Sequence, residues 1–252
     1  MPKIRLHNTD RYGAATLTAS SEATALPVEA SQDVDRSYIW RSLTETGTQE
    51  IDIDLGSVLA VTAAAVANVK LVGTGVLELY ERGDGGSPGS ATLVDTLSTQ
   101  DGDRRTAYVH FGSESHRHWQ LKWTNPTSAS DYAELGFAFL GTYFEPAVNV
   151  NPPRMAESDP SVVRASVDGQ RRTAARTRVL SGAWQWTDIS AADRDSLAAL
   201  WTSHGARIPL FATLDTSLDW TTVFHYLTAN LEQPFKPVAG LYDFGLGWRE
   251  VT

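Results

Sequence analysis

Residues 50–55, with the sequence EIDIDL, decide the fold class of the first half of the chain. Apolar and charged residues alternate there with a period of two, which is typical of a strand with one face on a core and the other in water. The pattern predicts that the three apolar side chains face inward and that the two aspartates face solvent. Gly56 follows directly, and we expect it to end the strand.

The same period recurs through the first 146 residues. Residues 61–71, VTAAAVANVKL, contain alanines that also suit a helix, but their valines and short flanks favour a strand. Other apolar residues share one face of an expected strand: Leu77 and Leu79; Trp119, Leu121 and Trp123; Leu135, Phe137 and Phe139. Short strands separated by turn signals, without an amphipathic helix, predict a β-sandwich or jelly roll.

The strand that ends this series runs into a bridge of different character. Residues 137–155, FAFLGTYFEPAVNVNPPRM, begin as a buried strand and lose all apolar rhythm. The consecutive prolines Pro152 and Pro153 favour an extended, semi-rigid spacer. We therefore expect a β-sandwich at 1–146, a proline-rich linker at 147–160 and a second domain at 161–252.

The second domain is expected to be α+β, with one helix at about 190–204. Asp168 and Gly169 mark the turn of a long hairpin that precedes the helix. Ser190 is placed as the N-cap, Asp193 at the third helical position and Gly205 at the C-cap. Three residues form an apolar stripe at helical spacing: Leu197, Leu200 and Trp201.

The composition argues against several classes of function. The chain has a net charge of −9 and no cysteine, so it forms neither a disulfide framework nor a thiolate metal site. A nucleic-acid backbone is not expected as the main partner, because that partner requires a basic surface. No run of about 18 apolar residues occurs, so no membrane insertion is expected. The N-terminus also lacks the apolar region of a signal peptide.

No stretch carries a convincing catalytic arrangement, so we expect a protein that is not an enzyme. His116 and His118 lie two residues apart on an expected strand and would suit a metal, but no third ligand is evident, and a polar strand is the preferred interpretation. Ser113 or Ser115 beside His116 lacks the strand–turn–helix elbow of a nucleophilic serine. We expect no cofactor and no metal.

Two acidic turns have the oxygen-rich sequences that calcium prefers: Asp33 with Asp35, and Asp101 with Asp103. The spacing of an EF-hand is absent, and Asp-Gly is a frequent way to build a turn without any ion. We therefore interpret both segments as ordinary turns.

The best candidates for contact with a partner or ligand are aromatic and arginine residues. Tyr38, Trp40 and Arg41, in RSYIWRS, suit either a sugar platform or an interface anchor, and they suit equally well a plug at one end of the sandwich. Trp220 lies in a turn-rich stretch, where an exposed position would indicate a contact and a buried one a core.

The sequence RRTAARTR at 171–178 is the basic cluster of the chain. On a strand, Arg172, Arg176 and Arg178 would line one side, with Arg171 on the other. One interpretation is a solvated strand. The other is an electrostatic contact with the acidic remainder of a neighbouring copy.

Three stretches of the first domain resemble discoidin-type jelly-roll domains: LHNTDRYGAATLTASSEATALPVEASQDVDRSYIWRS at 6–42, QEIDIDLG at 49–56 and AELGFAFLGTYFEP at 133–146. The resemblance implies a discoidin-like jelly-roll sandwich that binds sugars or lipids, or acts as a spacer. The pair of cysteines found in some of these domains is missing here.

The second domain is similar to tail and baseplate proteins of long-tailed bacteriophages. The similarity rests on SGAWQWTDISAADRDSLAALWTSHGARIPLFATLD at 181–215 and on GWREV at 247–251. It implies a tail-tube-like domain in a homo-trimer or homo-hexamer ring at the virion tail tip, assembled in the bacterial cytoplasm. Neighbouring tail-tube and baseplate proteins would be its partners, and DNA would only pass through the lumen.

Two hypotheses follow. The preferred one is a structural component of a phage tail tip or baseplate, in which the second domain builds the ring. The alternative is a carbohydrate-binding module that takes part in binding host surface glycans, with Tyr38 and Trp40 exposed and stacked on sugar rings.

Overall fold

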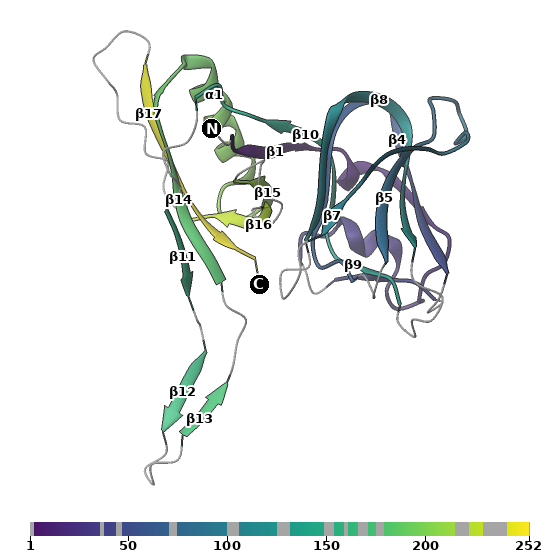
Figure 1. The fold of residues 1–252 in the computed structure, drawn as a ribbon, viewed down its shortest axis with the longest axis horizontal. Helices are drawn as coiled ribbons and strands as arrows, with labels where there is room; N and C mark the ends of the chain where they lie inside the picture. The colour runs from purple at the N-terminus through teal and green to yellow at the C-terminus, as the bar shows by residue number, and fades with distance from the viewer. Residues whose placement is uncertain are drawn as a thin grey trace. The chain divides into compact units, whose positions relative to one another are not determined.

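The computed structural model describes residues 3–35, 38–43, 47–70, 75–99, 106–124, 132–148, 154–158, 161–165, 171–174, 179–214, 222–228 and 241–251. The chain divides into two compact units (Figure 1). One is built mainly on Leu6–Phe144 and the other on Glu145–Thr216 and Val223–Thr252. The exact boundaries expected from the sequence stay a prediction.

The first unit is an antiparallel β structure with two short 3-10 turns. Its strands are β1 (Arg5–Asp10), β2 (Thr16–Ala19), β3 (Trp40–Arg41), β4 (Thr48–Val66), β5 (Val76–Glu81), β6 (Thr92–Thr96), β7 (Ser98–Thr99), β8 (Ala107–Thr124), β9 (Glu134–Leu135) and β10 (Ala138–Phe144), and its 3-10 turns are η1 (Tyr12–Ala14) and η2 (Val28–Gln32). Neighbouring strands follow the order β1-β10-β4-β8-β5-β6, while β2 also pairs with β4 and β7 with β8. Strands β3 and β9 form a separate two-stranded ribbon.

Strands β4 and β8 are long partners that run side by side through this unit (Figure 1). The expectation that Gly56 ends a strand is wrong, because β4 continues through it. Gly56 has a φ of +76°, and the pairing of β4 with β8 shifts register between Asp54 and Leu59. A glycine with positive φ at a register shift makes a β-bulge, which bends a strand without ending it. The strand expected at 61–71 is confirmed as far as Val66.

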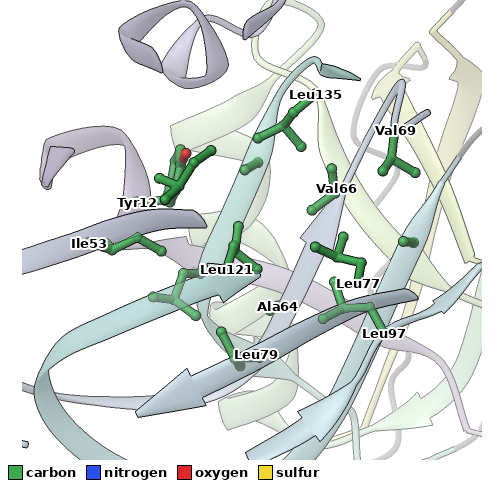
Figure 2. Packing of buried hydrophobic residues seen from close by; sticks show 14 of the residues in the cluster. Tyr12, Ile53, Ala64, Val66, Val69, Leu77, Leu79, Leu97, Leu121 and Leu135 are labelled. Atoms are coloured by element: carbon green, nitrogen blue, oxygen red, sulfur yellow. The ribbon is translucent and has the colours of Figure 1, made fainter. Parts of the chain in front are cut away.

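The apolar faces expected from the sequence meet in one buried cluster, part of which Figure 2 shows. The residues expected to face inward that belong to this cluster are Ile51, Ile53, Leu77, Leu79, Trp119, Leu121, Trp123 and Leu135. Phe137 and Phe139 are also buried but are not members of the cluster, to which their segment contributes Ala138 and Leu140 instead. Leu55 is only partly buried but packs against the same cluster. Because these side chains come from β4, β5, β8, β9 and β10, the cluster ties distant parts of the sequence together.

The second unit contains β-strands and one helix in its described part. Its elements are β11 (Arg154–Ser158), β12 (Val162–Ala165), β13 (Arg171–Ala174), β14 (Val179–Ile189), α1 (Ala191–His204), β15 (Leu210–Thr213), β16 (Thr222–Leu227) and β17 (Tyr242–Glu250). The strand order is β11-β14-β17-β16-β15, and β12 pairs with β13 in a separate ribbon. The tail-tube-like character expected for this unit stays a prediction.

Part of the segment expected to be a linker is a strand. Within 147–160, β11 pairs antiparallel with β14, so that Arg154 lies opposite Ala183 and Ser158 opposite Val179. The backbone groups of β11 that face β14 are therefore paired within a sheet, whereas those of a solvated spacer would bond to water. Pro152 and Pro153 lie outside the described residues.

The helix expected in the second unit is confirmed together with both of its caps. The Oγ of Ser190 accepts a hydrogen bond from the backbone N–H of Asp193 at 3.1 Å. At the other end, Gly205 has a φ of +53° and donates its N–H to the carbonyl of Trp201 at 2.8 Å. Leu197 and Leu200 of the apolar stripe are buried and Trp201 is half-buried. Among the described residues, no helix has the length and apolar character needed to cross a membrane.

Candidate functional site

In the ribbon of β3 and β9, fully buried residues alternate with half-buried ones. Trp40 lies opposite Leu135, and both are fully buried. The ring of Trp40 packs on that of Trp123, with centroids 5.2 Å apart. The interpretation of Trp40 as an exposed sugar platform is therefore wrong, because this side chain belongs to the buried packing.

Arg41, the next residue of the ribbon, is held in place by its backbone and by an aromatic ring. Its N–H donates to the carbonyl of Leu26 at 3.2 Å, and its own carbonyl accepts from the N–H of Ala23 at 2.9 Å. Its guanidinium carbon lies 4.7 Å from the centroid of the Tyr132 ring. A guanidinium stacked on a ring has one face covered but keeps its in-plane N–H groups as donors.

The charge of Arg41 is not neutralised within the described part of the chain. Glu134 lies directly opposite it in the ribbon, but no ion pair joins the two side chains, and no other described carboxylate pairs with Arg41. The Nε–H of Arg41 is enclosed and has no acceptor. A buried donor without a partner is unfavourable, so this N–H carries an energetic cost in the fold.

A third charged residue adjoins the same ribbon. Lys70 forms an isolated antiparallel bridge with Glu134, and its N–H donates to the Glu134 carbonyl at 3.0 Å. Residues at directly opposite positions project on the same side of a sheet. Arg41, Glu134 and Lys70 therefore form a row in which one carboxylate lies between two cations.

Tyr38 precedes this ribbon and is the exposed aromatic residue of the segment. Its side chain is 56% exposed, and its N–H donates to the carbonyl of Asp35 at 3.0 Å. We refer to Tyr38, Arg41, Lys70, Tyr132 and Glu134 together as the β3–β9 patch. Tyr132, Glu134 and Lys70 escaped sequence reasoning, since their proximity to Arg41 arises from pairing of segments far apart in the chain.

The other contact candidates lie mostly beyond the described residues. Arg176, Arg178 and Trp220 fall outside them. Arg172 belongs to β13, where it lies opposite Arg164 of β12. The register of this ribbon is centred on position 168, where the sequence indicated a turn, although Asp168 and Gly169 themselves lie outside the described part.

His116 and His118 hold a loop. The Nδ1 of His116 lies 3.1 Å from Oδ1 of Asp84, and the Nε2 of His118 donates to the carbonyl of Gly85 at 2.7 Å. Among the described residues no group of three metal-ligating side chains is found. Ser115 and Ser113 form no hydrogen bond to His116 in this part of the chain.

Asp52 and Asp54, expected to face only solvent, are engaged by arginines. Asp52 accepts from Arg82 at 2.7 Å and Asp54 from Arg117 at 2.7 Å. The hydrogen bonds from Arg117 lower the pKa of Asp54 to about 2. Both aspartates are therefore paired with arginines instead of being solvated alone.

The side chain of Asp33 bonds to the backbone of its own segment. Oδ1 of Asp33 accepts the backbone N–H of Asp35 at 2.9 Å, which is the turn-forming arrangement of an aspartate. Asp101 and Asp103 lie outside the described residues.

Comparison with known proteins finds solved structures that are similar to part of the chain. No protein-family profile matches the sequence, and no curated protein matches it. Chitosan-binding module 1 of a chitosanase/glucanase from Paenibacillus sp. IK-5 is similar, with 20% identity and a TM-score of 0.46 over 52% of this chain and 98% of that one. A Clostridium perfringens family 32 module in complex with GalNAc-β-1,3-galactose has 16% identity and a TM-score of 0.43 over 53% and 100%. A galactose complex of another family 32 module from Clostridium perfringens has 15% identity and a TM-score of 0.42 over 56% and 99%.

Proposed function

We propose that the first unit is a carbohydrate-binding module and that the β3–β9 patch contacts the sugar. The single observation that carries this proposal is the stacking of Arg41 on Tyr132 directly opposite a Glu134 with which it forms no ion pair. The patch thus presents an aromatic ring, a hydrogen-bond donor on Arg41 and a hydrogen-bond acceptor on Glu134. The donor and the acceptor are not paired with each other.

These groups match the chemistry of a sugar ring. A sugar has a face of C–H groups and a rim of hydroxyls, so it needs an apolar surface beside donors and acceptors. Tyr38 and Tyr132 supply aromatic surface, since an aromatic ring is apolar on its face and polar at its hydroxyl. Arg41 donates and Glu134 accepts.

The patch is suited to binding without turnover. Glycoside hydrolysis ordinarily uses a pair of carboxyl groups on either side of the bond that is cleaved. Among the described residues, the patch contributes one carboxylate, that of Glu134. We therefore propose that the protein holds a glycan and does not cleave it.

A glycan array probed with the full chain tests this proposal, using variants that leave the core intact. Tyr38→Ala and Arg41→Gln remove accessible side chains, and we expect each to weaken binding about tenfold, equivalent to about 1.4 kcal/mol. Val58→Ser is the matched control, because Val58 is an exposed residue of β4 outside the patch. Trp40→Ala is unsuitable since Trp40 is buried.

The proposal fails if the full chain binds no glycan, or if Tyr38→Ala and Arg41→Gln bind as tightly as Val58→Ser. Loss of binding in all three variants would place the sugar elsewhere or indicate a folding defect. Far-UV circular dichroism of each variant separates those two cases.

We also propose a second role, as a structural part of a virion tail tip, on the basis of the arginine ribbon. Residues 162–178 carry five arginines and one aspartate, within a chain of net charge −9. Arg164 and Arg172 are opposite each other in the ribbon of β12 and β13. An isolated two-stranded ribbon is marginally stable, so contact with an acidic neighbouring copy would stabilise this basic segment.

Mass photometry of the full chain tests this second role. A discrete trimer or hexamer that dissociates at high salt, and in the double variant Arg164→Gln/Arg172→Gln, supports it. A monomer at every salt concentration contradicts it and leaves the carbohydrate proposal untouched.

A further inference from the structure

We infer that a pair of histidines, His7 of β1 and His110 of β8, makes the first unit sensitive to protons, so that it is tied together near neutral pH and loosened in acid. The Nε2 atoms of the two rings lie 2.9 Å apart. His7 is 1% exposed and His110 is half-buried. Both residues lie outside the β3–β9 patch, so their response to pH is independent of the proposed carbohydrate binding.

The pair joins two strands that are not neighbours in the sheet. In the strand order, β10 and β4 lie between β1 and β8. The residue of β4 opposite His110 is Ala63, and the residue of β10 opposite Ala63 is Gly141. Residues at directly opposite positions project on the same side of a sheet, so these two small residues leave room for the rings. The histidine pair is therefore a tie across four strands.

The hydrogen bond between the two rings limits how many protons the pair can hold. A neutral imidazole has one N–H and one bare nitrogen, whereas an imidazolium has an N–H at both nitrogens. The bond therefore forms when both rings are neutral or when one of them carries an added proton. It is lost when both are protonated, because two N–H groups and two positive charges then face each other. The tied pair accommodates one added proton.

This limit sets the sign of the pH dependence. In the unfolded chain, both histidines can be protonated below about pH 6.5, the ordinary value for this side chain. As the pH falls through that value, the unfolded chain binds more protons than the folded chain with its tie intact. The stability that the tie supplies is therefore present above that value and is lost in acid.

Aromatic rings surround the pair. The ring centroid of Phe139 lies 4.9 Å from that of His7. The ring centroids of Tyr108 and Tyr143 lie 5.5 and 5.2 Å from that of His110. Such rings displace the water that would solvate a second positive charge, so they add to the cost of the second proton.

Charged side chains of the adjoining strands bond to other groups. Arg5 of β1 donates its Nε–H to Glu145, the residue after β10, at 2.9 Å. Asp10, at the end of β1, accepts the N–H groups of Tyr12 and Gly13 at 2.9 and 3.0 Å. Burial of its carboxyl group raises the pKa of Asp10 to about 6, so its protonation favours the folded state in acid, opposite to the effect of the histidines. Variants that change only a histidine isolate the pair, because Asp10 is common to all of them.

An NMR titration of the histidine rings in the full chain tests whether the two residues share their protons. We expect two protonation steps separated by more than about one pH unit, with the ring signals of both His7 and His110 shifting in each step. Rings that each follow a single independent step would overturn the inference. The titration uses the unaltered chain, so it decides the question even where a variant does not fold.

Hydrogen exchange measured by mass spectrometry at about pH 7.5 and about pH 5 tests the loosening, after correction for the intrinsic effect of pH on exchange. We expect protection of the β1 segment, Arg5–Asp10, to fall about tenfold in acid. Protection of β14 in the other unit should change by less than about twofold and serves as the internal control.

Two histidine variants show whether the pair causes this change. His110→Gln keeps a donor and an acceptor beside His7 but cannot be protonated, so protection of β1 should no longer fall in acid. His116→Gln is the matched control, because His116 is a histidine of the same strand that lies beside Asp84 instead, and it should retain the tenfold fall. Protection of β1 that does not change with pH in the unaltered chain, or that falls equally in His110→Gln, contradicts the inference.

Discussion

Arg117 holds Asp54 through two parallel hydrogen bonds, from Nε to Oδ1 at 2.7 Å and from Nη2 to Oδ2 at 2.8 Å. Oδ1 of Asp54 also accepts the N–H of Gly56 at 2.8 Å, at the β-bulge of β4. One carboxylate thus joins strand β8 to the bulge of its neighbour, and the bonds from Arg117 hold its pKa at about 2.

The first prediction concerns acid stability. Because the pKa of Asp54 is lower in the folded chain than its ordinary value of 3.8, its ionised form stabilises the fold above that value. That contribution is lost as the pH falls through about 2. Asp54→Asn should lower the free energy of unfolding by about 1 kcal/mol near neutral pH, the modest value reflecting partial exposure of the pair. Urea unfolding across pH measures it.

The loss in Asp54→Asn should vanish at the acid end, where the wild-type carboxylate is protonated as well. Asp95→Asn serves as the control because Asp95 is exposed on β6. A loss of the same size at every pH would mean that the pair does not act through its charge.

The second prediction contrasts two aromatic residues that lie two positions apart. Trp40 is fully buried and Tyr38 is exposed. Trp40→Ala should lower the free energy of unfolding by about 3–5 kcal/mol because it leaves a cavity against Trp123. Tyr38→Ala should change it by less than about 0.5 kcal/mol. Denaturant unfolding followed by far-UV circular dichroism compares them, and similar values for the two variants would contradict the assignment.

The third prediction concerns the cap of helix α1. Ser190→Ala removes the acceptor for the N–H of Asp193 and should cost about 1 kcal/mol. Ser190→Asp restores an acceptor and should recover most of this loss. Ser196→Ala is the matched control, since Ser196 is an exposed residue within the helix and alanine is a good helix former. Thermal unfolding of the three variants measures the effect, and equal midpoints for Ser190→Ala and Ser196→Ala would rule out a stabilising cap.

The fourth prediction compares two glycines. A Cβ on Gly141 would collide with the backbone carbonyl of Thr9 on the paired strand β1, and a backbone atom cannot move aside cheaply. Gly141→Ala should therefore lower the free energy of unfolding by at least about 2 kcal/mol. Gly56→Ala meets open space and bears only the strain of its positive φ, about 1 kcal/mol. Denaturant midpoints rank the two, and the reverse order would contradict the pairing of β1 with β10.

Local patterns in the sequence predict those features whose causes are local. The alternation at residues 50–55 gives the buried face of β4, because strand geometry places every second side chain on one side. Ser190 and Gly205 give both ends of α1, since a cap satisfies backbone groups a few residues away.

Features that depend on distant partners escape such patterns. The sequence around Gly56 predicts a strand end because glycine is common in turns. Glycine is also common in bulges, and only the pairing with β8 distinguishes a bulge from a turn here. Asp54 reads as solvated because its partner Arg117 comes from another strand. Trp40 and Tyr38 are aromatic residues of the same short segment, so the sequence alone does not distinguish a buried one from an exposed one. Trp40 is buried because it packs on Trp123, which is distant in the sequence. Arg41 meets Tyr132 for the same non-local reason.

In the ribbon of β3 and β9, residues that pack in the core alternate with residues that are more accessible. Trp40 and Leu135 are fully buried in the core, whereas their neighbours Arg41 and Glu134 are only half-buried. Under the proposed carbohydrate-binding function, substitutions of Arg41 and Glu134 would change which ligand is bound while the packing around Trp40 keeps the fold stable. Relatives of this chain that differ at these two positions would then be expected to differ in ligand before they differ in fold.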